Sequence, residues 1–157
     1  MSVSAKEIQE IRNETGLGVM DIKNAMEEAG GDREKAMEIL KKRVGDKMEK
    51  RSGRATGQGK IGAYVHGDGK SAVMVEVNCE TDFVAKNEDF QQFIKDLTLQ
   101  IISMKPENVE ELLKQDFVKD TKKTIEDLLK DIIAKTGENI VIGRFVVYSI
   151  GKEPVSC

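Results

Sequence analysis

Apolar residues in the first fifty positions recur at intervals of three or four, which is the period of amphipathic helices. Ser4 and Glu7 have the spacing of a capping box, so a helix is predicted over residues 5–14. A second apolar stripe predicts a helix over 19–29, which ends at a pair of glycines. Asp32 is a suitable N-cap for a third helix. The chain therefore begins with three predicted helices.

The segment 53–59 is rich in glycine and separates these helices from a region with a different pattern. We interpret residues 1–52 as a three-helix module that resembles ubiquitin-associated domains, and 53–59 as a linker. Residues 41–60 hold eight basic side chains and two acidic ones, whereas 61–157 hold 12 basic and 17 acidic ones. Because no sustained basic face results, we interpret the basic run as a solvated helix end and expect no nucleic-acid partner.

From Lys60 the apolar period changes to two, which is typical of β-strands. Two alternating runs around the turn 67–70 predict a β-hairpin. After the hairpin the pattern predicts three helices and one more strand, over residues 87–106, 107–114, 121–135 and 140–150. The predicted fold class is therefore α+β, with a core domain over 60–157 that contains a three-stranded antiparallel sheet and helices.

The predicted strand 140–150 is apolar on both of its alternating faces, and Arg144 is its only charged residue. A strand with one solvated face should alternate apolar and polar residues, so both faces of this sheet need cover. The local helices can cover one face. We predict that a second copy of the chain covers the other face, as a twofold homodimer, unless the N-terminal module folds back over it.

The composition argues against a membrane-spanning, a secreted or a disulfide-rich protein. The net charge is only −3, and the apolar stretches are far shorter than the roughly 18 residues of a membrane span. The start of the chain lacks the apolar segment of a signal peptide, so we expect a cytoplasmic protein with no membrane partner. Two cysteines, Cys79 and Cys157, are too few for a disulfide framework, which fits a reducing compartment.

The reactive side chains do not assemble a catalytic site. His66 is the only histidine, and no nucleophile motif lies near it in the sequence. The sequence has no Gly-x-x-x-x-Gly-Lys-Ser/Thr phosphate-binding loop. We therefore expect that the protein does not hydrolyse nucleotides itself.

One segment carries a specific resemblance. Residues 76–86 read Glu-Val-Asn-Cys-Glu-Thr-Asp-Phe-Val-Ala-Lys, and they resemble at every position the hallmark segment of the elongation factor Ts family. Residues 11–26 resemble a second family motif, with Ile11 and Met26 where leucine is usual, and 137–145 resembles the last core strand. Long members of the family carry a second core subdomain and a coiled-coil insertion, so this chain resembles a short form.

The resemblance implies a nucleotide exchange factor that binds elongation factor Tu and promotes GDP release so that GTP can bind. Exchange makes and breaks no covalent bond, so the resemblance implies a protein that is not an enzyme and that needs no metal or cofactor of its own. In this family the tetrapeptide that matches Thr81, Asp82, Phe83 and Val84 enters the G domain of elongation factor Tu and disturbs its magnesium site. Magnesium requires near-ideal octahedral geometry, so a small displacement of its ligands weakens the site. The resemblance thus assigns Phe83 as a wedge and Asp82 as a residue that rearranges polar contacts in the partner.

The residues alone leave another interpretation of this tetrapeptide open. A strand that turns into a helix, capped by Asn78 or Thr81, would place Phe83 in the core. The loop Leu17, Gly18, Val19 and Met20 also has two interpretations, since its apolar side chains can fill the small module or contact the same G domain, as the resemblance implies. We expect a mixture, with some of these side chains exposed.

Two other classes of protein remain as alternatives. The first is a ubiquitin-associated-type protein-binding module fused to a small α+β domain, which the three helices allow. The second is an RNA-binding protein that uses the basic residues of 41–60. Neither alternative explains the eleven residues 76–86.

Overall fold

The computed structural model describes residues 3–156, so Cys157 lies outside the described residues. The elements have the following bounds: α1 (Ala5–Thr15), α2 (Val19–Glu28), α3 (Arg33–Arg51), β1 (Gln58–Val65), β2 (Ser71–Cys79), α4 (Asp82–Ala85), α5 (Glu88–Met104), α6 (Val109–Lys114), β3 (Asp116–Phe117), β4 (Asp120–Thr124), α7 (Ile125–Thr136), β5 (Val141–Ser149) and β6 (Val155–Ser156). The predicted mixture of helices with an antiparallel sheet is confirmed.

The helices α1, α2 and α3 enclose an apolar interior of their own. Ser4 and Glu7 form the predicted capping box, in which the Ser4 hydroxyl accepts from the Glu7 amide at 3.1 Å. Arg33 at the start of α3 pairs with Glu10 and Glu14 and so ties α3 to α1. The interior consists of Ile11, Ile22, Ala25, Met26, Ala36 and Leu40. This cluster does not include side chains from the sheet.

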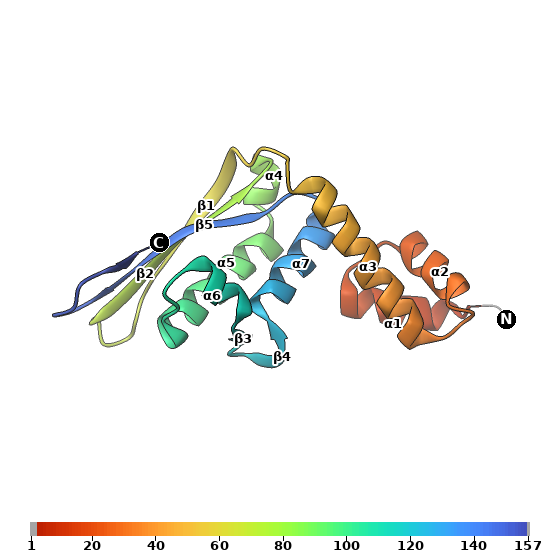
Figure 1. Cartoon of the computed structure of the whole chain (residues 1–157), viewed down its shortest axis with the longest axis horizontal. Helices are drawn as coiled ribbons and strands as arrows, with labels where there is room; N and C mark the ends of the chain where they lie inside the picture. Colours follow the sequence, from red (N-terminus) through yellow and green to blue (C-terminus); the bar gives the residue numbers. More distant parts are fainter. Residues whose placement is uncertain (1–2, 157) are drawn as a thin grey trace.

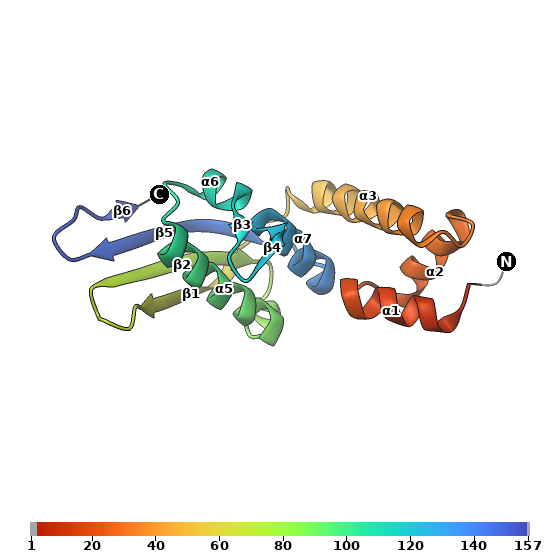
Figure 2. The same ribbon diagram turned by 90° about the horizontal axis from the view of Figure 1, so that it is seen from below.

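The larger sheet has the strand order β1-β2-β5-β6, and each neighbouring pair is antiparallel. The prediction of a three-stranded sheet is wrong, because the sheet has a fourth strand. This is the short edge strand β6, in which Val155 pairs with Val147. Helices α5, α6 and α7 all lie against one face of this sheet (Figures 1 and 2). Helix α5 approaches β1 closely because Gly62 has no side chain, and a Cβ atom there would lie 2.2 Å from Cγ2 of Ile94.

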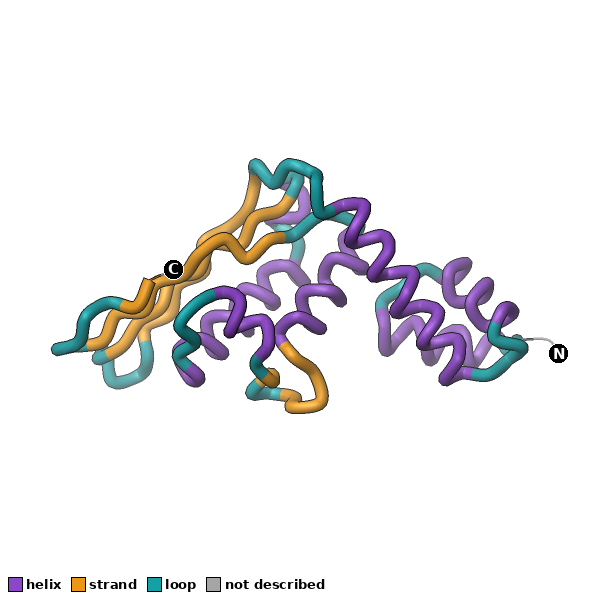
Figure 3. The backbone as a smooth tube through the Cα atoms, in the orientation of Figure 1, coloured by secondary structure: helices purple, strands orange, loops and turns teal. Residues whose placement is uncertain are grey.

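A small hairpin replaces the start of one predicted helix. Residues 121–124, predicted as helical, belong instead to β4, which pairs with β3 away from the larger sheet (Figure 3). The helix starts later because Thr124 and Asp127 form a capping box at the start of α7. A capping box fixes the first turn of a helix, so the polar residues before it are free to form a strand.

The buried side chain of Gln100 fixes this hairpin to α5. Its Nε2 donates to Oε1 of Gln115 and to the carbonyl of Asp116, at 3.2 Å and 3.0 Å. Its Oε1 accepts from the amide of Val118 at 2.9 Å. A buried amide is stable only when its polar atoms are paired, and here the main chain of the hairpin supplies most of the partners.

The opposite face of the sheet is apolar and exposed. Its exposed side chains include Ile61, Val65, Met74 and Tyr148, which belong to three neighbouring strands. Near the middle of this face, Arg144 Nε donates to Glu76 at 2.9 Å. Helices α1, α2 and α3 lie beyond α7 at the far end of the molecule and cover neither face of the sheet (Figures 1 and 2).

Candidate functional site

The segment after β2 turns at once into the short helix α4. Thr81 is the N-cap of this helix, with extended backbone angles, and its hydroxyl accepts from the amide of Val84 at 3.4 Å. Val84 and Ala85 point into the core, where they are at most 9% exposed. Phe83 lies between the cap residue Thr81 and the buried Val84 and is 89% exposed. The interpretation that places Phe83 in the core is therefore wrong.

Asp82 begins α4 and lies beside Phe83 on the surface. Its carboxylate pairs with Lys86 Nζ at 2.7 Å, one helical turn away, and both side chains are mostly exposed. A carboxylate in the first turn of a helix interacts favourably with the free amides there. The acid and the aromatic ring are thus exposed side by side, while Thr81 and Val84 on either side of them hold the turn.

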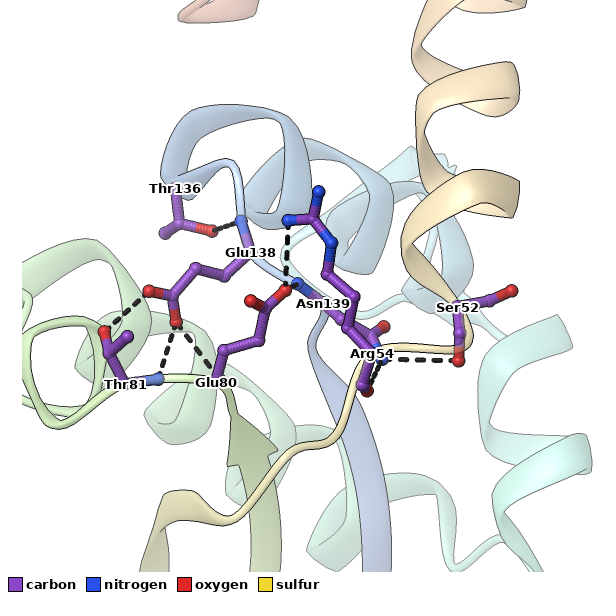
Figure 4. A network of polar contacts seen from close by, with 7 residues as sticks. All are labelled: Ser52, Arg54, Glu80, Thr81, Thr136, Glu138 and Asn139. Atoms are coloured by element: carbon purple, nitrogen blue, oxygen red, sulfur yellow. Dashed lines mark hydrogen bonds and ion pairs between the residues drawn. The ribbon is translucent and has the colours of Figure 1, made fainter.

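A carboxylate from a distant part of the chain holds the main chain of this turn (Figure 4). Glu138 follows α7, and its Oε1 accepts from the amides of Glu80 and Thr81 at 3.1 Å and 2.9 Å. Its Oε2 accepts from the hydroxyl of Thr81 at 2.6 Å. In the other direction, the carboxylate of Glu80 accepts from the amide of Asn139 at 2.6 Å. We call these four residues, Glu80, Thr81, Glu138 and Asn139, the reciprocal clamp.

The reciprocal clamp also contacts the segment that follows α3. The side-chain amide of Asn139, which is 7% exposed, donates to the carbonyls of Ser52 and Arg54 at 3.5 Å and 3.0 Å. The guanidinium of Arg54 lies 3.6 Å from the carboxylate of Glu80. The same cluster therefore joins the turn after β2, the end of α7 and the chain that leaves the N-terminal helices (Figure 4).

Cys79 supports the turn from inside the core. Its side chain is fully buried, and its thiol donates to the carbonyl of Thr81 at 3.2 Å. Burial raises the pKa of the Cys79 thiol, and the negative charge of Glu138 raises it further. The thiol therefore stays protonated at neutral pH and keeps its role as a donor. This residue is a structural cysteine rather than a nucleophile.

The loop between α1 and α2 also presents apolar side chains. Gly18 is the N-cap of α2 and offers no side-chain cap, while the amide of Leu17 donates to the hydroxyl of Thr15 at 3.3 Å. Leu17 is partly buried against the interior of the three helices. Val19 is 40% exposed and Met20 is 64% exposed. The loop is thus mixed, with one inward side chain and two outward ones.

The site presents an exposed aromatic ring and an exposed carboxylate. Within residues 3–156, no cluster of three or more histidine, cysteine, aspartate or glutamate side chains is placed to hold a metal ion. Over the same residues no helix is both long enough and apolar enough to cross a membrane. Phe83, the most exposed large apolar side chain in the described structure, lies on a capped turn beside a carboxylate. These features define an α+β protein that presents an aromatic ring and a carboxylate side by side on its surface.

Comparison with known proteins gives the family. The family model described as "Elongation factor TS" matches residues 80–156. The chain is 40% identical to "Elongation factor Ts" of Nitratidesulfovibrio vulgaris, over 98% of this chain and 99% of that protein. It is 41% identical to "Elongation factor Ts" of Coprothermobacter proteolyticus, over 97% and 100%, and 39% identical to that of Geobacter metallireducens, over 97% and 91%. The chain belongs to the elongation factor Ts family, whose members are translation elongation factors.

The chain is shorter than these relatives. The alignment with the Nitratidesulfovibrio vulgaris protein spans 198 positions. Because the chain has 157 residues, at least 41 aligned positions have no counterpart in it. Since the alignment covers nearly all of both proteins, these positions lie within the relative rather than beyond its ends. The chain is therefore a short form compared with this relative.

The sequence predicts the residues of the turn but not the residues that hold the turn in place. The candidate residues Thr81, Asp82, Phe83 and Val84 are adjacent in sequence, and the structure keeps them together. Glu138 contacts this turn from 57 positions away, so no local spacing marks it. The N-terminal candidates Leu17, Gly18, Val19 and Met20 form a separate surface, at the loop between α1 and α2. The sequence marks Glu138 in two indirect ways: it comes directly after the helix stop at Gly137, and it lies within residues 137–145, which resemble the last core strand of the family.

Proposed function

We propose that this protein binds elongation factor Tu in its GDP-bound form, disturbs the magnesium site there and promotes GDP release, so that GTP can bind. The names of its relatives support the family role in translation elongation. One structural observation carries the mechanism. Phe83 is 89% exposed on a capped turn, whereas Phe90 and Phe93, only a few residues further on, are at most 5% exposed.

Phe83 acts as a wedge in this mechanism. Burying a phenylalanine side chain gains about 1.5–3 kcal/mol, and this free energy is unused while the ring faces water. When the ring enters the G domain of elongation factor Tu, that gain offsets the displacement of groups around the magnesium ion. Asp82 rearranges polar contacts of a neighbouring partner helix, while Thr81 and Val84 hold the pair in position.

Exchange follows from linkage between two bound molecules. If the factor weakens GDP binding to elongation factor Tu, then GDP weakens binding of the factor to the same degree. GTP can therefore displace the factor in turn, and the factor is recovered unchanged. No covalent bond forms or breaks, so the protein is a nucleotide exchange factor and not an enzyme, and it uses no cofactor or metal of its own.

A second contact comes from the N-terminal helices. We propose that residues 1–52 are a ubiquitin-associated-like module, that 53–59 are a linker and that 60–157 are the core domain. Two separate apolar clusters support this division. The loop Leu17, Gly18, Val19 and Met20 would then lie against the same G domain, with Val19 and Met20 as its exposed contact groups.

Stopped-flow fluorescence tests the proposed activity. Elongation factor Tu loaded with a fluorescent GDP is mixed with an excess of unlabelled nucleotide, with and without this protein. The proposal expects a release rate that rises with the concentration of the protein and then saturates. A release rate that does not depend on this protein would overturn the exchange role. We propose that this activity takes place in the cytoplasm and involves neither nucleic acid nor membrane as a direct partner.

We also propose that the protein forms a homodimer through the exposed face of its sheet. Ile61, Val65, Met74 and Tyr148 form an apolar surface there. The one ion pair on this face, Arg144 with Glu76, is neutral as a pair, so two copies can meet without like-charge repulsion. An isologous contact between two such faces closes as a twofold dimer.

Sedimentation equilibrium at micromolar concentration, in reductant, tests the dimer. A mass twice the 17.5 kDa of one chain is expected. Met74→Lys should lower that mass to one chain, because Met74 is 50% exposed in the middle strand and a lysine there would be desolvated in the contact. Met104→Lys, on an exposed position at the end of α5, is the matched control and should leave the mass doubled. A single-chain mass for the unmodified protein would contradict the dimer.

A further inference from the structure

The amides of Glu80 and Thr81 lie just beyond the regular part of the sheet. The last paired residue of β2 is Cys79, which faces Gln58 on β1. Main-chain amides that leave a sheet need another acceptor when they are removed from water. Both amides find it in a single oxygen, Oε1 of Glu138, at 3.1 Å and 2.9 Å. One side chain thus fixes two consecutive peptide groups at the entrance to the turn.

The second oxygen of Glu138 acts through the cap of α4. The hydroxyl of Thr81 donates its proton to Oε2 of Glu138 at 2.6 Å. With its proton directed there, the oxygen keeps its lone pairs for the amide of Val84, at 3.4 Å. The carboxylate therefore orients the group that starts the helix, and this helix carries Asp82 and Phe83.

Glu138 is itself held in place from both sides. Its own amide donates to the hydroxyl of Thr136 at 3.4 Å. The next residue, Asn139, donates its amide to the carboxylate of Glu80 at 2.6 Å, so the two segments exchange hydrogen bonds in both directions. Such paired contacts over-determine the position of the turn, as Figure 4 shows.

We propose that Glu138 is a positioning residue for nucleotide exchange, which holds the main chain at Glu80 and Thr81 so that Phe83 is presented in a single direction. This inference rests on the proposed function, because it concerns how the wedge is aimed. Glu138 does not have to touch the partner. Its effect reaches the partner through Thr81 and the start of α4.

Two substitutions separate the hydrogen bonds that Glu138 makes. Glu138→Ala removes all three. Glu138→Gln keeps the shape but has only one oxygen, so it can accept either from the two amides or from the Thr81 hydroxyl, and not from both. Glu126→Ala serves as the matched control, because it removes a glutamate on the first turn of α7, before Glu138, that pairs with Lys130 at 3.9 Å.

The closing experiment combines exchange kinetics with amide hydrogen exchange measured by NMR. In Glu138→Ala we expect GDP release at saturating factor to become roughly tenfold slower, as for a misplaced acting group. The concentration for half-saturation should change much less, because the other contact groups remain. Hydrogen exchange should accelerate at the amides of residues 80 and 81 while the amides of α5 keep their protection. The release rate and amide protection of Glu138→Gln should lie between those of Glu138→Ala and those of the unmodified protein. Glu126→Ala should match the unmodified protein in both measurements.

The outcomes distinguish the positioning role of Glu138 from the exchange role of the whole protein. If Glu138→Ala releases GDP at the unmodified rate while Phe83→Ala is slow, the positioning role is overturned and the exchange role stands. If neither the unmodified protein nor any variant stimulates release, the exchange role fails, and so does the inference that Glu138 serves it. Unchanged protection of amides 80 and 81 in Glu138→Ala overturns the inference in either case. Should Glu138→Ala fail to fold, the same comparison is made with Glu138→Gln.

Discussion

The segments 81–84 and 17–20 both start a helix and both present apolar side chains, but they are held in different ways. Thr81 caps its helix with a hydroxyl, and the carboxylate of Glu138 braces that cap from a distant part of the chain. Gly18 caps its helix without any side-chain hydrogen bond. The first segment is therefore fixed by side chains, while the second depends on the packing of its neighbours.

This difference indicates how each segment can contribute to binding. A braced turn can aim one stiff aromatic ring, and Phe83 is 89% exposed. An unbraced loop suits side chains that adapt to a surface, and the flexible Met20 is 64% exposed. We therefore expect one large contribution from the turn and several small ones from the loop, and the following changes test that contrast.

The largest effect is expected for Phe83→Ala. Truncation of a central aromatic contact costs about 2 kcal/mol or more, which corresponds to roughly thirtyfold slower stimulated GDP release. The melting temperature should hardly change, because the ring is exposed. Phe90→Ala is the informative contrast, since Phe90 is fully buried and its truncation should destabilise the fold by about 3–5 kcal/mol. If Phe83→Ala unfolds the protein or keeps full activity, the wedge assignment is wrong.

Removal of residues 1–53 should have the next largest effect. The remainder keeps its own apolar cluster and is expected to fold, although it loses the partly buried Met48 that packs on that cluster. The loss of several weak contacts should weaken binding to elongation factor Tu by roughly tenfold, or about 1.4 kcal/mol. Circular dichroism checks the fold and titration calorimetry measures the affinity. An affinity equal to that of the intact chain would show that the loop 17–20 contributes nothing.

The sequence predicted those parts of the fold that have local signals. The capping pair Ser4 and Glu7 and the stop at Gly137 both lie where helices begin or end. Residues 121–124, Thr-Lys-Lys-Thr, have no apolar alternation that would mark a strand, so they were predicted as helix. The hairpin that they form depends on Gln100 in another helix. A contact across that distance leaves no pattern in the residues around it.

The candidate site shows the same limit. Apolar spacing alone left Phe83 equally suited to the core or the surface, and the resemblance to a family directed attention to the surface. The exposure of Phe83 agrees with that choice. Glu138 was missed because its partners, Glu80 and Thr81, become neighbours only after β2 and the end of α7 come together in the fold.

Asp82→Ala should reduce stimulated release by roughly fivefold, or about 1 kcal/mol, as expected for the loss of a polar contact to the partner. The matched control is Lys86→Ala, which breaks the same exposed ion pair and keeps the carboxylate. Exposed ion pairs contribute about 1 kcal/mol or less to folding, so both variants should melt near the unmodified protein. If Lys86→Ala slows release as much as Asp82→Ala, the ion pair matters and Asp82 is not a contact group.

Met20→Ala should give the smallest effect and sharpen the contrast most directly. A partly buried methionine contact loses about 0.7 kcal/mol on truncation, so the half-saturating concentration should rise roughly threefold. The maximal rate of GDP release should not change, because the loop supplies affinity and the braced turn supplies the wedge. Met104→Ala is the control, since Met104 is also about half exposed, at 51%, but lies at the end of α5. A fall in maximal rate for Met20→Ala, with unchanged half-saturation, would mean that the loop acts on the magnesium site as the turn does, and the distinction between the two segments would be lost.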